Sequence, residues 1–332
     1  MVPVRPFDYE RPWNIDAALA AVRDTPGAMY LGGGTNLIDL MRLGVLAPEL
    51  LVDVSRLPFD RVEETGDGGL VIGAAVRSAD LASHLGVRRR YPVLAQAALS
   101  VGSAQIRNMG TVAGNLLQRT RCAYFTDVTK PCNKREPGSG CPAVDGVHRN
   151  LAVVGYSPSC VATHPSDLAV AFAALDAVVR IEGATGPRRV PITAFYRDPG
   201  DDPRQDTVLE HADLITGIEV PPAGAAAHSA YRKVCDRTSF AFAVVSVAVV
   251  LEVTAGAVRD CRIALGGVAP KPWRAERAEE VLYGADATEE NFARAARTEP
   301  AGARPLRDNG YKVPLVRNLL TRTLIDLAKK GA

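Results

Sequence analysis

Four cysteines lie close together in the middle of the chain, and thiolates suit soft metals and iron–sulfur clusters. They are Cys122, Cys132, Cys141 and Cys160. Their spacing lacks the C-x2-C pairs that are typical of zinc sites and of familiar [4Fe–4S] sites. Two disulfides would need an oxidising compartment. The residues alone therefore leave three alternatives open: an iron–sulfur cluster, a zinc ion, or structural or free thiols.

The segment that carries these cysteines, residues 118–165, shows no sustained helical or strand period and is rich in proline and glycine. Ordering its backbone costs about 1–2 kcal/mol per residue, and it has few large apolar residues to offset that cost. We therefore expect it to be disordered or tied together by its thiols, in which case metal binding is coupled to folding. Five basic residues predict a cationic shell around the thiols: Arg119, Arg121, Lys130, Lys134 and Arg135.

A run of glycines offers a second chemistry. Gly32, Gly33, Gly34, Thr35 and Asn36 stand between an expected strand, residues 28–31, and an expected helix from Leu37. Glycines let backbone N–H groups converge, and a helix start adds unpaired donors, so the pattern favours binding of a diphosphate. The alternative is a tight turn that needs three glycines. The G-x-G-x-x-G dinucleotide fingerprint is absent.

A second polar segment covers residues 100–115. Ser103, Asn108, Thr111 and Asn115 are suited to hydrogen bonds with an extended ligand, although each alone is more often a turn residue. We expect a polar loop between two apolar segments here. The five histidines are scattered, and no Ser-His-Asp arrangement stands out. Cys235 and Cys261 lie in apolar, strand-like surroundings and are expected to be core residues.

The elements that position these groups alternate between helices and strands along the chain. Asn14 and Ser166 are candidate helix N-caps, and residues 254–256 predict a hairpin turn. Residues 221–224 are the best candidate for a linker. We expect helices at 15–22, 78–85, 91–99, 166–175, 273–283 and 311–328, and strands at 50–54, 70–72, 151–154, 177–181, 214–220, 241–253 and 258–265.

Length and charge set outer limits on the class of protein. The chain has 332 residues, which predicts two domains, and 39 basic against 37 acidic residues, giving a net charge of +2. This balance does not favour nucleic acid or an anionic membrane as a partner. No apolar run is long enough to span a bilayer. The first 30 residues contain acidic residues and no apolar core, so we expect no signal peptide.

The two glycine segments resemble a known family. Leu31 to Leu37, then Gln105 to Leu116, the Ser166-Asp167 motif and Tyr231-Arg232-Lys233 occur in the order found in the FAD-binding subunits of the molybdenum hydroxylases, such as xanthine and carbon monoxide dehydrogenases. The resemblance covers nearly the whole chain. It implies an α+β fold: an FAD-binding domain of the p-cresol methylhydroxylase type, with two α+β subdomains, at 1–222, and a smaller α+β flavoprotein domain at 223–332.

The resemblance also implies a set of FAD-binding residues. Residues 31–37 would hold the diphosphate, and Thr111, Gly114 and Asn115 would line the second phosphate and ribitol side. Asp167 would bind the polar chain of the flavin, and Ile215 and Lys233 would lie near the ring. Judged by itself, Lys233 is more simply a solvated lysine on a strand edge. The full set is Leu31, Gly32, Gly33, Gly34, Thr35, Asn36, Leu37, Ser103, Gly110, Thr111, Gly114, Asn115, Gln118, Asp167, Ile215 and Lys233.

A subset of this family carries a cysteine-containing insertion with a [4Fe–4S] cluster, and residues 118–165 look most like the insertion of the periplasmic aldehyde oxidoreductase subunit. The resemblance thus implies a cluster held by Cys122, Cys132, Cys141 and Cys160. It places no catalytic residue on this chain. Instead, it implies a heterotrimer in which electrons pass from molybdopterin on a large subunit, through [2Fe–2S] centres on a small subunit, to FAD and a final acceptor.

Two alternatives of other kinds compete with this reading: a stand-alone FAD oxidoreductase of the same fold, and a scaffold stapled by zinc. The resemblance further implies a periplasmic location reached by co-export with a partner, and cytoplasmic residence is the default otherwise. This sequence does not identify the aldehyde substrate, because the substrate pocket would lie on another subunit.

Overall fold

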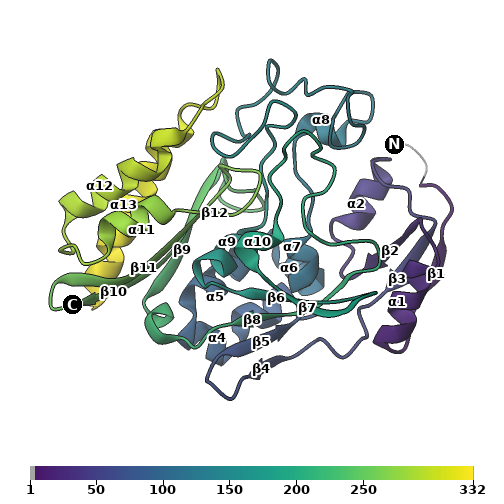
Figure 1. The fold of residues 1–332 in the computed structure, drawn as a ribbon, viewed down its shortest axis with the longest axis horizontal. Coiled ribbons are helices and arrows are strands. Elements are labelled where there is room, and N and C mark those ends of the chain that lie inside the picture. Colours follow the sequence, from purple (N-terminus) through teal and green to yellow (C-terminus); the bar gives the residue numbers. More distant parts are fainter. Residues whose placement is uncertain (1–3, 332) are drawn as a thin grey trace.

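The computed structural model describes residues 4–331 and contains three sheets, each packed against helices (Figure 1). A small N-terminal unit, a central unit and a C-terminal unit follow one another across the molecule, and the segment with the four cysteines lies beside the central unit. Helices and strands are mixed throughout. The predicted α+β class is confirmed.

The N-terminal sheet is parallel, with strand order β1-β3-β2. Its first helix begins where expected, because the Asn14 side chain accepts a hydrogen bond from the Ala17 N–H at 2.8 Å. The glycine run follows β2 directly and ends at the start of α2. The elements are β1 (Asp8–Glu10), α1 (Ile15–Arg23), β2 (Ala28–Leu31), α2 (Leu37–Arg42) and β3 (Leu50–Asp53).

The central sheet is antiparallel, with strand order β4-β5-β8-β6-β7. Its apolar residues share one core with the central helices, including the fully buried α9. The strands are β4 (Val62–Glu64), β5 (Leu70–Gly73), β6 (Val178–Gly183), β7 (Gly186–Pro191) and β8 (Leu214–Val220). The helices are α3 (Ser78–Ser83), α4 (Leu85–Arg90), α5 (Pro92–Ser100), α6 (Ala104–Met109), α7 (Val112–Leu116), α9 (Asp167–Ala174) and α10 (Ile192–Phe195).

The C-terminal sheet, of order β12-β11-β10-β9, is covered on both faces. Along β10, Val247 and Val249 pack in one core with the C-terminal helices, whereas Ala248 and Val250 pack in the other core with α5 and α9. This period of two is what a strand buried on both faces requires. The elements are η1 (Gly224–Ala227), β9 (Ser229–Val234), β10 (Val245–Thr254), β11 (Ala257–Gly266), β12 (Trp273–Arg274), α11 (Glu276–Leu282), α12 (Glu289–Thr298), η2 (Glu299–Gly302) and α13 (Lys312–Gly331).

Most expected elements are present, and a few predictions are wrong. The hairpin is confirmed: Ala255 and Gly256 both have positive φ, as a two-residue turn between twisted strands requires. Residues 100–115 are not a loop, because Ser103 and Thr111 cap two short helices, α6 and α7. Residues 151–154 form no strand, although they are buried in cores. The helix α12 was not expected, since its composition is strongly polar. The boundary at 222/223 stays a prediction.

The cysteine-bearing segment is folded, although the structure describes no helix or strand in it other than the short α8 (Ala123–Thr126). It has a small apolar core that includes Cys122, Phe125 and Cys160. It is also tied to the C-terminal helix: the buried Lys312 ammonium donates to the carbonyls of Asn150 at 2.8 Å, Leu151 at 3.0 Å and Gly267 at 2.6 Å. The segment is therefore ordered by packing and by backbone contacts.

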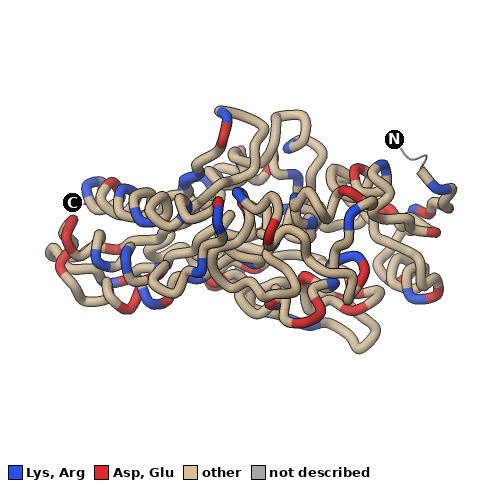
Figure 2. The backbone as a smooth tube through the Cα atoms, turned by 90° about the horizontal axis from the view of Figure 1, so that it is seen from above, with Lys and Arg blue, Asp and Glu red and all other residues tan. Residues whose placement is uncertain are grey.

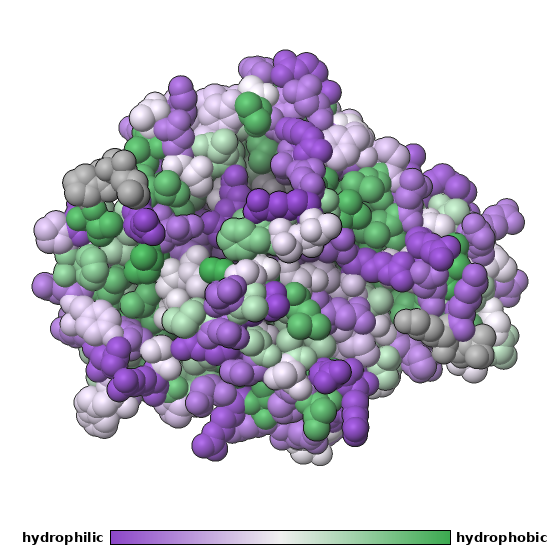
Figure 3. All heavy atoms as spheres, turned by 180° about the vertical axis from the view of Figure 1, so that it is seen from behind, coloured by the Kyte–Doolittle hydropathy of each residue, from purple (hydrophilic) through white to green (hydrophobic). Residues whose placement is uncertain are grey.

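Basic and acidic residues are interspersed along the whole chain (Figure 2). On the face turned away from the viewer of Figure 1, hydrophilic residues surround small groups of hydrophobic ones (Figure 3). Within residues 4–331, no helix is long and apolar enough to cross a bilayer.

Candidate cofactor sites

The glycine run and the α6–α7 segment lie against each other. A Cβ on Gly33 would lie 1.9 Å from the Met109 carbonyl oxygen, and one on Gly32 would lie 3.0 Å from Thr111 Oγ1. Gly34 has a φ of +72°, which favours glycine. The three glycines are thus required by close contact and by backbone conformation. Tight packing and a ligand cradle are both satisfied by this geometry.

One cavity, of about 210 Å³, opens between the glycine run, α7 and the start of β8. The backbone N–H groups of residues 33–35 have no hydrogen-bond acceptor in the part of the chain that the structure describes. Asn36 Nδ2 is buried and lacks a partner there, while Asn36 Oδ1 accepts from the Arg119 N–H at 2.8 Å. Unpaired donors in the wall of a cavity are what an oxyanion ligand such as a diphosphate needs.

A second cavity, of about 640 Å³, adjoins the first, and the two share Thr35, Asn36, Thr111 and Gly114 in their walls. An ion pair lies at the far wall: Lys233 Nζ donates to Asp167 Oδ2 at 2.8 Å and to the Ser100 carbonyl at 3.0 Å. Tyr231 donates to Asp167 Oδ1 at 2.5 Å. The two cavities thus share part of their walls, with the unpaired donors of the glycine run in the first and the Lys233 ammonium in the second.

Burial controls the electrostatics of this wall. It raises the pKa of Asp167, although Lys233 and Tyr231 act to lower it, and it raises the pKa of Tyr231 well above the usual value. The Lys233 side chain is 8% exposed although β9 is an edge strand. The interpretation of Lys233 as a solvated lysine is therefore wrong, because α5 and α9 cover it.

Most of the predicted FAD-binding residues line these two cavities. The first is lined by Gly32, Gly33, Gly34, Thr35, Asn36, Leu37, Thr111, Gly114 and Ile215. The second is lined by Thr35, Asn36, Gly110, Thr111, Gly114, Asn115, Gln118, Asp167 and Lys233. Leu31 and Ser103 line neither: Leu31 ends β2, and the Ser103 hydroxyl caps α6 by accepting from the Ile106 N–H at 3.3 Å.

The four clustered cysteines line one small cavity together. Asn133 brings their neighbours together, because Oδ1 accepts from the Gly140 N–H at 2.7 Å and Nδ2 donates to the Ser159 carbonyl at 2.9 Å. All six cysteines of the chain are free thiols. Among residues 4–331, no group of three or more His, Cys, Asp or Glu side chains is arranged to hold a metal ion. The donor set itself, four thiols around one space, has the chemistry that an iron–sulfur cluster requires.

The basic residues near these thiols form only part of the predicted shell. Lys134 lines the cysteine cavity, whereas Arg135 donates to the Tyr124 and Phe125 carbonyls and Arg121 lies 4.7 Å from the Phe242 ring. As thiols, Cys122 and Cys160 have pKa values raised by burial, to about 11 for Cys160. The predicted cationic shell is therefore present in part: Lys134 lines the cavity and Arg135 binds two residues that line it, whereas Arg121 contacts Phe242 instead.

Two residues at the candidate cofactor sites were not predicted from the sequence. Tyr231 was noted as part of a motif but not as a partner of Asp167. Asp206, in the connection between α10 and β8, bridges Arg119 and Lys134, and the sequence carries no signal for it because its partners are more than 70 positions away. Cys261 is buried in β11, as expected, and Cys235 is half-buried just after β9.

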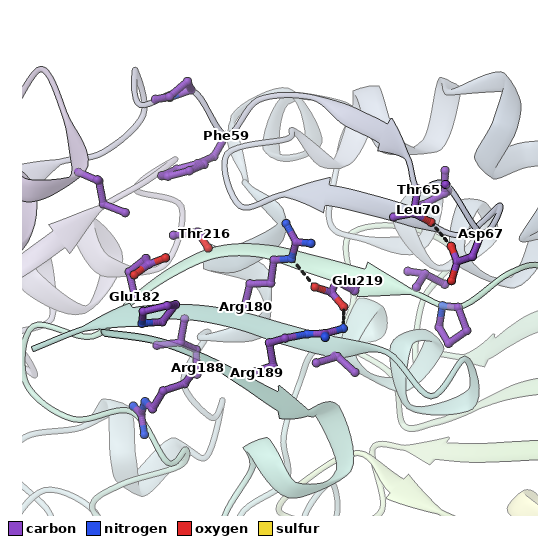
Figure 4. A pocket seen from close by; sticks show the side chains of 18 of the residues that line it. Phe59, Thr65, Asp67, Leu70, Arg180, Glu182, Arg188, Arg189, Thr216 and Glu219 are labelled. Atoms are coloured by element: carbon purple, nitrogen blue, oxygen red, sulfur yellow. Dashed lines mark hydrogen bonds and ion pairs between the residues drawn. The ribbon is translucent and has the colours of Figure 1, made fainter. Parts of the chain in front are cut away.

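Another cavity, of about 1010 Å³, lies at the central sheet and is lined by none of the predicted residues. Figure 4 shows that Glu219, in its wall, lies between Arg180 and Arg189 and pairs with both. Because these three side chains are already paired with one another, this cavity offers a weaker ligand site than the glycine-lined pair.

Comparisons with known proteins agree with this geometry. The FAD binding domain in molybdopterin dehydrogenase matches residues 5–223, and the CO dehydrogenase flavoprotein C-terminal domain matches residues 203–327. The chain is 47% identical over 328 residues to the aldehyde oxidoreductase FAD-binding subunit PaoB of Escherichia coli, covering 97% of this chain and 98% of that protein. The chain belongs to the FAD-binding subunits of the molybdenum hydroxylases.

More distant relatives of this FAD-binding subunit share its fold. The carbon monoxide dehydrogenase medium chain of Hydrogenophaga pseudoflava is 28% identical over 329 residues, covering 98% of this chain and 97% of that one. A solved structure of that dehydrogenase superposes with a TM-score of 0.77 over 100% of both chains, at 28% identity. A reconstituted CO dehydrogenase from Oligotropha carboxidovorans gives a TM-score of 0.77 at 25% identity, also over 100% of both chains. The FAD-binding subunit is therefore part of an oxidoreductase, and the predicted family is confirmed.

Proposed function

We propose that this chain is the FAD- and [4Fe–4S]-containing subunit of a heterotrimeric aldehyde oxidoreductase. The observation that carries the proposal is the joint presence of two prepared sites: the glycine-lined cavities, and four cysteines around one cavity. Its partners would be a large molybdopterin subunit and a small [2Fe–2S] subunit, with electrons passing through them to FAD and on to a final acceptor. FAD, when bound, supplies the conversion between one-electron and two-electron transfer.

The residues proposed for FAD divide by cavity. The glycine run and Asn36 would hold the diphosphate through N–H donors, because these donors lack acceptors within the described chain. Asp167 would fix Lys233 at the wall of the larger cavity, and the ammonium would favour negative charge on a bound ring. Leu31 and Ser103 would support the site from behind, since neither lines a cavity.

The residues proposed for the cluster are Cys122, Cys132, Cys141 and Cys160. A [4Fe–4S] cluster bound by four thiolates carries negative charge, and the neighbouring Lys134 ammonium would offset part of it. Binding would deprotonate the buried thiols, so that assembly and proton release are linked. Whether this cluster relays electrons or only ties the segment together, its ligands are the same.

The cluster is tested by metal and cofactor analysis of the purified complex. We expect flavin absorption, a broad iron–sulfur absorption, and iron and acid-labile sulfide in the ratio of a [4Fe–4S] cluster. Cys132→Ser should lose the cluster signal and keep FAD, whereas the control Cys235→Ser should keep both, because Cys235 lies outside the cysteine cavity. Full cluster content in Cys132→Ser, or zinc in place of iron, would contradict the ligand assignment.

The assembly and its location are tested by isolating the tagged chain from its native cells. We expect a large molybdenum-containing subunit and a small [2Fe–2S] subunit to copurify, and the complex to occur in the periplasmic fraction after co-export with a partner. Aldehyde oxidation by this chain alone would favour the stand-alone oxidoreductase instead. Recovery in the cytoplasm would contradict the proposed location and leave the cofactor assignment in place.

A further inference from the structure

One partly buried carboxylate touches a cation at each of the two cofactor sites. Asp206 Oδ1 lies 2.5 Å from Lys134 Nζ, and Asp206 Oδ2 lies 2.8 Å from Arg119 Nε. Lys134 lines the cysteine cavity, whereas Arg119 lines the smaller glycine-lined cavity. The two oxygens of one side chain therefore hold one cation in the wall of each site.

Both cations are held firmly by further contacts. Lys134 Nζ also donates to the Pro203 carbonyl at 2.8 Å, and Arg119 Nη2 donates to the Arg204 carbonyl at 3.1 Å. These two carbonyls belong to the same connection that carries Asp206. That connection therefore fixes each cation twice, once by charge and once by a backbone oxygen.

Arg119 is also fixed to the two sites directly. Its backbone N–H donates to Asn36 Oδ1 at 2.8 Å, which orients the amide whose Nδ2 lies unpaired in the cavity wall. Its guanidinium carbon lies 5.1 Å from the centre of the Phe125 ring, and Phe125 lines the cysteine cavity. Arg119 therefore contacts the glycine-run site through its backbone N–H and the cysteine cavity through the Phe125 ring.

The charges of these three side chains do not balance, because two cations, Lys134 and Arg119, share the single carboxylate of Asp206. Burial acts to raise the pKa of Asp206, but Lys134 and Arg119 outweigh it and hold the pKa below its usual value. The carboxylate is therefore ionised at neutral pH. Removing its charge would leave the buried Lys134 and the partly buried Arg119 uncompensated, which is costly at low dielectric.

We propose that Asp206 is a positioning residue that couples the two cofactor sites, by offsetting the Lys134 charge at the cluster and by fixing Arg119 at the FAD diphosphate. The inference rests on the proposed function, since it assumes a cluster at the four cysteines. It predicts a simple signature. A change at Asp206 affects both sites, a change at Lys134 affects mainly the cluster, and a change at Arg119 affects mainly FAD.

The test measures two equilibrium quantities on the purified complex: the reduction potential of the cluster, by EPR-monitored titration, and the dissociation constant of FAD after deflavination. In Asp206→Asn the cluster becomes easier to reduce, with the oxidised-to-reduced ratio at fixed potential falling about tenfold, or about 59 mV for one electron. The FAD dissociation constant rises about tenfold, because Arg119 loses its anchor.

Matched variants give the test its specificity. Asp202→Asn removes the same charge from the same connection, but Asp202 is exposed and pairs with Arg204, so both quantities should stay at the wild-type values. Lys134→Met should lower the potential and leave FAD affinity unchanged, and Lys134→Arg should restore the potential. Arg119→Gln should weaken FAD binding more than it changes the potential. These variants carry the test if Asp206→Asn does not fold.

The outcomes separate this inference from the proposal beneath it. A wild-type complex that contains FAD but no cluster would overturn the cluster proposal and this inference together. A complex that contains both groups, in which Asp206→Asn changes neither quantity more than Asp202→Asn does, would overturn this inference alone. The same holds if Lys134→Met and Arg119→Gln each change both quantities equally.

Discussion

At the scale of single residues, the FAD site depends on the lack of a side chain at Gly33. Gly33 has no Cβ, and one built there would overlap the Met109 carbonyl oxygen and lie 2.7 Å from its carbon. The backbone of the glycine run can approach α6 only because position 33 is glycine. That approach brings the N–H donors of the run into the wall of the same cavity as Thr111.

The Gly33→Val substitution should therefore remove FAD. The valine would push the run away from Met109, at a cost of about 1–3 kcal/mol for overpacking, and the donors would no longer converge. We expect flavin content, measured by absorbance per chain, to fall below a tenth of wild type. Gly66→Val is the control, since a Cβ there meets no atom within 4 Å. Normal flavin content in Gly33→Val would disprove the diphosphate role.

At the scale of elements, the cysteine-bearing segment is organised by one amide. Asn133 follows Cys132, and its side chain binds backbone groups of Gly140 and Ser159, which precede Cys141 and Cys160. A single side chain therefore aligns the neighbours of three cysteines. This arrangement replaces regular secondary structure, which the segment lacks apart from the short α8 within the described chain.

Asn133→Ala should loosen the segment without touching a ligand. It removes two side-chain hydrogen bonds, worth about 1 kcal/mol each, so we expect cluster iron to be lost to a chelator several times faster than from wild type. FAD content should not change. Glu136→Ala, an exposed residue of the same segment, serves as the control. Equal rates of iron release in the two variants would show that Asn133 has no organising role.

At the scale of the whole molecule, buried polar groups join units that are distant in sequence. His164 is buried, its Nε2 lies 3.3 Å from the Leu116 carbonyl of α7, and its ring packs edge-on against Tyr196 at 4.6 Å. Burial lowers the pKa of His164 from 6.5 to about 4. The folded protein therefore holds this ring neutral where the unfolded chain would protonate it.

The sign of the resulting pH dependence follows from proton counts. Between pH 6.5 and 4 the unfolded chain binds the extra proton, so stability falls as the pH falls through this range. The loss attributable to His164 is about 3 kcal/mol, at 1.36 kcal/mol per unit. Denaturant unfolding at pH 7 and pH 4.5 should show a smaller difference for His164→Phe than for wild type. The exposed His228→Gln should behave as wild type, and an unchanged difference in His164→Phe would contradict the assignment.

The sequence by itself determined the local features. Capping residues such as Asn14 and Ser166, the 254–256 turn and the glycine run were all predictable, because each depends on interactions within a few residues. The family was also predictable, because each of its motifs is a short segment and the motifs occur in a fixed order. Short segments with caps inside them, such as 100–115, were misjudged, since single polar residues look alike in loops and helix starts.

Only the tertiary structure decided which charges meet. Lys233 is buried on an edge strand because α5 and α9 cover it, and Arg119 and Lys134 share Asp206 across more than 70 positions. The buried strand-like residues 151–154 pair with no strand, because their backbone groups bind Val161, Val268 and Arg304 instead. Coulombic and packing energies depend on distance in space, which the order of residues along a chain does not specify.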